Sequence, residues 1–129
     1  MPTPARVPRQ RPTLTPRVKC WLNLGQSFLL GPNYLRFLRA VDETGTIRAA
    51  GATVGWSYRT CLNRVRRIDA VLGTPALTTV RGGASGGGAR LTPTARRLVE
   101  RYEAWLDAAR AASYRAFVRI FARAGGRLR

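Results

Sequence analysis

The amino-acid sequence predicts a mostly α-helical α+β domain, and two kinds of periodicity support this fold class. Segments in which apolar residues recur every three or four positions predict helices, and shorter segments in which they alternate predict paired strands. The length of 129 residues leaves room for one small core and tails. We expect a disordered basic arm at residues 1–17, a folded domain at 18–92, a long helix at 93–124 and a tail at 125–129.

The first predicted elements are a hairpin and a helix. Residues 18–24 alternate apolar and polar side chains, which predicts a strand, and residues 28–30 predict its partner after a turn. Pro32 suits the first turn of the helix that follows. The inward-facing residues of that helix are predicted to be Tyr34, Leu35, Leu38 and Val41.

Residues 46–73 predict two short helices joined at Gly55. Thr46 and Ser57 are suitable N-caps, and Ala49, Ala50 and Gly51 keep the first helix narrow enough for a close crossing. The three- and four-residue spacing in the second helix predicts an apolar face made of Tyr58, Cys61, Leu62, Val65, Ile68 and Leu72.

The opposite face of this second helix is basic. Arg59, Asn63, Arg66 and Arg67 lie on it, with Thr60 and Arg64 on its flank, and no acid among them. In a helix-turn-helix the second helix enters the DNA major groove, where Arg pairs with guanine and Asn with adenine. A solvated helix face is the alternative interpretation.

A second hairpin is predicted from strands at residues 76–80 and 89–92, joined by the glycine-rich segment 81–88. A basic hairpin directly after a helix-turn-helix predicts the wing of a winged helix-turn-helix. Arg81 and Arg90 would anchor it to phosphates. A nucleotide-binding loop does not fit, because no Lys-Ser or Lys-Thr follows the glycines and no helix opens there. A tip without contacts remains the alternative. The full set predicted to bind DNA is Ser57, Tyr58, Arg59, Thr60, Asn63, Arg64, Arg66, Arg67, Arg81 and Arg90.

The long helix from Pro93 carries a heptad-like apolar seam. Such a seam either packs on the chain's own core or pairs with a second copy, and we favour a homodimer. The predicted dimer contacts are Leu98, Tyr102, Trp105, Leu106 and Ala109. Beyond Arg110 the helix is basic and amphipathic. That part could lie on a membrane surface, extend a dimer helix or bind phosphate.

The charge balance favours a polyanionic partner. The net charge of +17 comes from 23 basic and 6 acidic residues, and every base except Lys19 is arginine. Self-repulsion at this density is unfavourable unless a polyanion neutralises it, so we expect double-stranded DNA as the partner and binding that weakens with salt. The proline-rich arm adds four arginines; it either follows a phosphate backbone or is an inert tail.

Several classes of function are disfavoured by composition. The chain has no histidine, Cys20 and Cys61 lack metal or redox spacing, and the adjacent Asp42 and Glu43 lie at a helix end where solvated carboxylates are common. We therefore expect no enzyme activity, no metal and no cofactor. No apolar run is long enough to span a membrane and no signal peptide precedes the domain, so a cytoplasmic, nucleoid-associated protein is expected.

The segments FLLGPNYLRFLRAVDETGTIRAAG from Phe28, VGWSYRT from Val54 and RGGASGGGARLTP from Arg81 resemble the N-terminal DNA-binding domain of ModE-type molybdate-dependent regulators. RVRRIDAVLGTPAL also resembles the wider LysR-type DNA-binding domain. The resemblance covers roughly residues 18–107 and implies a dimeric bacterial regulator. ModE-type regulators sense molybdate through a C-terminal domain; because this chain ends after the long helix, direct molybdate binding is not expected.

The leading hypothesis is thus a sequence-specific transcriptional regulator whose helix at 57–72 enters the major groove and whose wing at 76–92 lies on the backbone or minor groove. An architectural, nucleoid-type protein that binds DNA without sequence preference is the alternative. A third hypothesis is an interaction module whose long helix recruits a protein partner.

Overall fold

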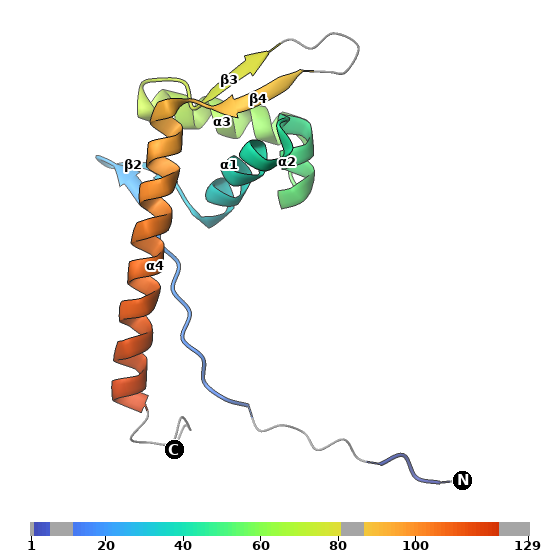
Figure 1. Cartoon of the computed structure of the whole chain (residues 1–129), viewed down its shortest axis with the longest axis vertical. Coiled ribbons are helices and arrows are strands. Elements are labelled where there is room, and N and C mark those ends of the chain that lie inside the picture. The colour runs from blue at the N-terminus through green and yellow to red at the C-terminus, as the bar shows by residue number, and fades with distance from the viewer. Residues whose placement is uncertain (1, 6–11, 81–86, 122–129) are drawn as a thin grey trace. The chain divides into compact units, whose positions relative to one another are not determined.

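The structure, a computed structural model, describes residues 2–5, 12–80 and 87–121. Within these residues it contains four helices and two antiparallel hairpins, in agreement with the predicted α+β class (Figure 1). The residues from Lys19 to Ala108 form one compact unit, and the described residues before and after them belong to a second. The described parts of the basic arm, 2–5 and 12–17, form neither helix nor strand.

The first hairpin is shorter than predicted. Strand β1 spans Leu22–Leu24 and β2 spans Ser27–Leu30, with Gly25 in the left-handed conformation at the turn. The prediction that the first strand begins at residue 18 is wrong. Instead of joining the ladder, Cys20 lies in the core, where its carbonyl oxygen accepts a hydrogen bond from the Tyr102 hydroxyl.

Helix α1 (Pro32–Thr44) begins with its proline and ends at Gly45, which is left-handed. The four residues predicted to face inward are buried, and so is Phe37. Helix α2 (Ile47–Val54) begins where Thr46 Oγ1 accepts a hydrogen bond from the Ala49 amide at 3.1 Å, as its N-cap position predicts. These two helices, with β2, supply the aromatic and aliphatic side chains that pack behind the third helix.

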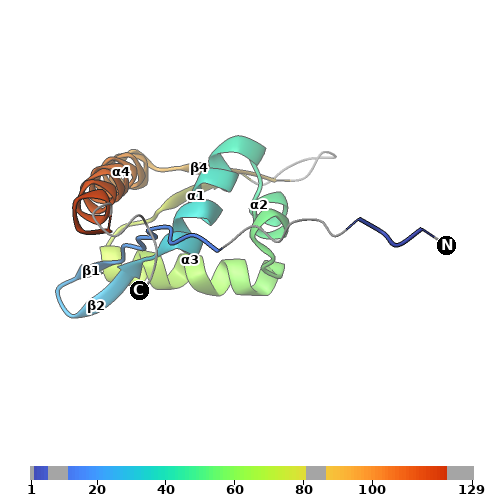
Figure 2. The same ribbon diagram turned by 90° about the horizontal axis from the view of Figure 1, so that it is seen from below.

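Helix α3 (Tyr58–Leu72) crosses close to α2 after the left-handed Gly55 (Figure 2). A Cβ atom at Gly51 would clash with the Cys61 sulfur, so the absence of a side chain at Gly51 permits the close crossing. Of the three small residues predicted to narrow α2, Ala50 and Gly51 are buried, but Ala49 is exposed and takes no part. Cys61 and Ile68 hold α3 to the core.

The second hairpin consists of β3 (Leu77–Val80) and β4 (Gly88–Leu91), paired from Leu77 opposite Leu91 to Val80 opposite Gly88. The Ala89 amide donates to the Gly45 carbonyl at 2.7 Å, which fixes β4 beside the end of α1. The tip at 81–86, including Arg81, lies outside the described residues.

Helix α4 spans Pro93–Phe121 and begins where Thr92 Oγ1 accepts from the Ala95 amide at 3.3 Å. Its buried residues are Ala95, Val99, Tyr102 and Leu106. Of the predicted dimer contacts, Tyr102 is 1% and Leu106 7% exposed, so both are buried within the chain's own core. Leu98 and Ala109 are half-buried, and Trp105 is exposed. No helix among the described residues is both long and apolar enough to cross a lipid bilayer.

Candidate nucleic-acid interface

The candidate DNA-binding surface begins with the N-terminal turn of α3. The Ser57 hydroxyl oxygen accepts from the Thr60 amide at 3.1 Å and donates to the Thr60 hydroxyl at 3.0 Å. The first of these bonds satisfies one of the backbone donors that a helix start otherwise leaves open. Two residues predicted to bind DNA therefore serve first to start the helix and set its direction.

The outer face of α3 is basic, as predicted. Arg59, Asn63 and Arg66 follow one another at steps of four and three, so they share one face, and Arg67 lies beside them; all four are exposed. The acid of this helix, Asp69, is turned away from that face, since its carboxylate accepts from the Ala76 amide at 2.8 Å. This face of α3 therefore exposes long hydrogen-bond donors to solvent, and no acidic side chain of α3 lies among them.

One flank of α3 rests on aromatic rings. The Arg64 guanidinium donates to the Tyr34 hydroxyl at 3.1 Å and lies over the rings of Tyr34 and Trp56. Arg67 lies over Phe28, with its guanidinium carbon 5.7 Å from the ring centre. These two arginines are therefore held by their surroundings while remaining exposed.

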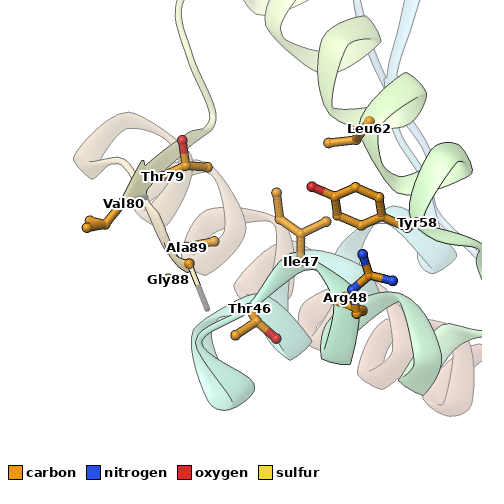
Figure 3. A pocket seen from close by; sticks show the side chains of 10 residues that line it. Thr46, Ile47, Arg48, Tyr58, Leu62, Thr79, Val80, Gly88 and Ala89 are labelled. Carbon is orange, nitrogen blue, oxygen red and sulfur yellow. The ribbon is translucent and has the colours of Figure 1, made fainter. Parts of the chain in front are cut away.

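The other flank of α3 borders a groove of about 640 Å³ between α2, α3 and the second hairpin (Figure 3). Figure 3 shows Tyr58 and Leu62 on one side with Arg48 below Tyr58, Thr79 and Val80 on the other side, and Ile47 between them. None of the described residues that line the groove is acidic. The residues that complete this lining are Thr46, Gly87, Gly88 and Ala89.

Tyr58 lies differently from its prediction. Its ring was expected on the apolar inner face, but the side chain is 43% exposed, and the Arg48 guanidinium carbon lies 4.5 Å from the centre of the ring. Such a separation is typical of a cation–π contact. Arg48 is not among the residues predicted to bind DNA, because those come from α3, its N-cap and the hairpin. Its position in the first turn of α2, a helix without acidic residues, is the sequence feature that could have indicated it.

Of the two hairpin arginines predicted to bind DNA, one lies among the described residues. Arg90 is exposed on β4 and pairs across the ladder with Thr78, which is exposed too. Its predicted partner Arg81 lies outside the described residues.

The acids form their ion pairs elsewhere, between α1 and α4. Arg96 binds Asp42 through two hydrogen bonds of 2.9 and 3.0 Å, and Arg39 binds Glu103 through both carboxylate oxygens. The hydrogen bond from Arg96 lowers the pKa of Asp42, and the bond from Arg39 lowers the pKa of Glu103. Five of the six acidic residues lie on α1 and α4, and Asp69 is the one on α3.

The described residues include no cluster of three or more His, Cys, Asp or Glu side chains that could hold a metal ion. Cys20 and Cys61 are buried free thiols, and burial raises the pKa of the Cys61 thiol. Cys61 therefore lacks the lowered pKa that a reactive thiolate requires.

The chain is similar in sequence to Mop and ModE proteins. The chain is 37% identical over 75 residues to the molybdenum-pterin-binding protein MopB of Rhodobacter capsulatus, covering 58% of the chain and 28% of the relative. It is 28% identical over 82 residues to the transcriptional regulator ModE of Haemophilus influenzae, covering 64% of the chain and 32% of the relative. The similarity supports a relationship to ModE proteins.

A third relative, the molybdenum transport protein ModE of Azotobacter vinelandii, is 32% identical over 75 residues, which cover 58% of the chain and 28% of the relative. The chain thus spans about a third or less of the length of these relatives. No family model matches it.

Proposed function

We propose that the chain is a sequence-specific transcriptional regulator that binds double-stranded DNA through a winged helix-turn-helix. In this proposal α3 is the recognition helix in the major groove, and the β3–β4 hairpin is the wing, on the backbone or minor groove. The observation that carries the proposal is the exposed face of Arg59, Asn63 and Arg66, which lacks an acid. The ModE relative named as a transcriptional regulator supports the same function.

The side chains on the two flanks of α3 indicate how this helix would lie in the major groove. An α-helix with its side chains is about 10–12 Å wide and the major groove is about 12 Å wide, so phosphates lie close to both flanks of an inserted helix. Arg64 and Arg67 would face one strand, and Arg48 and Arg90 the other. The central residues then meet base edges.

The proposal includes a homodimer acting on DNA in the cytoplasm. With Tyr102 and Leu106 in the core, the exposed Trp105 is the remaining large apolar side chain of the predicted dimer contacts. Sedimentation of the wild type and of Trp105→Glu tests this part. A change from dimer to monomer supports it, and a monomeric wild type refutes it. The molybdenum-pterin binding in the name of MopB is not carried over to this chain, because the chain covers only 28% of that relative.

Selection of bound sites from a random duplex pool, followed by gel-shift titration, tests the main proposal. Arg59→Ala should weaken binding to the selected duplex more than to a scrambled one, by about 5- to 100-fold if a bidentate contact to a base is lost. Arg90→Ala should weaken both duplexes alike. Equal affinity of the wild type for selected and scrambled duplexes would instead favour an architectural protein that binds by charge alone.

A further inference from the structure

We infer that Tyr34 is a positioning residue that holds Arg64 against a backbone phosphate of bound DNA. The inference rests on the proposed function in one respect, that α3 binds a duplex. Arg64 donates from Nη1 to the Tyr34 hydroxyl at 3.1 Å, and its guanidinium carbon lies 5.7 Å from the Tyr34 ring centre and 5.8 Å from that of Trp56.

Tyr34 is itself fixed by the core. Its side chain is 8% exposed, and its ring meets Phe28 and Trp56 edge to face, with ring centres 5.3 and 5.4 Å apart. Trp56 in turn contacts Phe37 at 5.2 Å. Because these rings come from β2, α1 and the turn before α3, the hydroxyl of Tyr34 is a fixed point relative to the recognition helix.

Arg64 differs in this respect from the arginines at the centre of the face. Arg59 and Arg66 make no hydrogen bond or ring contact with the described residues. An arginine side chain loses rotamer entropy when it binds, so one that is already held loses less on contact with its ligand. Of these three arginines, Arg64 is therefore the best preorganised for contact with a ligand.

Phosphate is the ligand that suits this geometry. Arg64 has five N–H donors, and the bond to Tyr34 uses one of them. The remaining donors of this exposed guanidinium are available for a bidentate bond to phosphate oxygens. Arg64 lies on the flank of α3, next to Arg67, which lies over Phe28. With α3 in the major groove, this flank would face a DNA backbone strand and not the base edges.

A double-mutant cycle on the full chain tests the inference, with Tyr34→Phe, Arg64→Ala and the double variant. Tyr34→Phe keeps the ring and removes only the hydroxyl. Tyr114→Phe, at an exposed tyrosine of α4, is the matched control. Dissociation constants are measured for a selected and a scrambled duplex over a range of salt concentrations, and thermal melting reports whether each variant is folded.

We expect Arg64→Ala to weaken both duplexes alike and to reduce the slope of log affinity against log salt by about 0.9, the value of one phosphate contact. Tyr34→Phe should weaken binding about two- to ten-fold, because the freed Arg64 side chain must then be ordered on binding, and should have no effect when Arg64 is already alanine. Arg64→Lys, which keeps the charge but not the planar fork, should weaken binding with the slope unchanged.

The inference is overturned if Tyr34→Phe changes nothing, or if it causes the same loss with and without Arg64. Should Tyr34→Phe fail to fold, Arg64→Lys decides alone: affinity equal to that of the wild type overturns the inference. Failure of the proposed function has a different signature. A wild type without preference for the selected duplex refutes the specific regulator, yet the cycle still tests the phosphate contact, because that contact is independent of sequence. No binding to either duplex overturns both.

Discussion

Replacement of Gly51 by alanine tests whether the close crossing of α2 and α3 depends on a residue without a side chain. A Cβ atom at this position would clash with the Cys61 sulfur and come within 2.9 Å of the Trp56 carbonyl oxygen. The sulfur belongs to a buried side chain and the oxygen to the backbone of the turn, so neither can move without shifting α3. We therefore expect Gly51→Ala to destabilise the fold.

The magnitude follows from two opposed contributions. Overpacking of a core costs about 1–3 kcal/mol, whereas alanine in place of glycine favours a helix by roughly 0.5–1 kcal/mol. Because a backbone atom takes part in the clash, we expect the upper part of the first range and a net loss of about 1–2 kcal/mol. For a domain of this size such a loss lowers the melting temperature by roughly 4–15 °C.

Urea unfolding followed by far-ultraviolet circular dichroism measures this loss. Ala52→Gly, at an exposed position in the same helix, measures the free-energy difference between alanine and glycine that arises from helix propensity alone. In a Cys61→Ala background the cost of Gly51→Ala should shrink but not vanish, because the Trp56 carbonyl remains. If Gly51→Ala is as stable as the wild type, the close crossing does not depend on glycine and our explanation of it is wrong.

Two further predictions concern charges. Arg48→Ala should weaken selected and scrambled duplexes equally and lower the salt slope by about 0.9 in gel-shift titrations; a loss restricted to the selected duplex would show that Arg48 contacts a base. The Arg39 guanidinium holds the pKa of Glu103 below its ordinary value of 4.5. The contribution of Glu103 to stability is therefore complete above pH 4.5, and it is lost as the pH falls through the lower pKa of the folded state. Thermal melting of the wild type should accordingly fall more steeply below about pH 4.5 than that of Glu103→Gln, and parallel curves would contradict this.

Local chemistry made the helix ends predictable from sequence. The Thr46 and Ser57 caps, the Gly55 turn and the proline at the start of α1 all lie where their residue types predict, because each depends on neighbours a few positions away. The outward direction of Arg59 and Arg66 was predictable for the same reason, since three-and-four spacing fixes a helix face.

Contacts between distant segments were not predictable. The apolar residues of α4 fit more than one seam, and only tertiary contacts, such as the bond from Tyr102 to the Cys20 carbonyl, select Val99, Tyr102 and Leu106 for the core. Likewise, the bond from Arg64 to Tyr34 joins residues thirty positions apart, and nothing in either segment alone indicates it. Arg48 over Tyr58 depends on the angle between α2 and α3, which periodicity does not specify.

The bond between the Asp69 carboxylate and the Ala76 amide gives the end of α3 and the start of the second hairpin a common anchor. A residue turned away from the exposed basic face of α3 thus helps to set the angle at which the hairpin leaves the helix. In the proposed function, a substitution at this one joint would change the spacing between the DNA contacts of α3 and those of the hairpin, with every arginine of the binding surface unchanged.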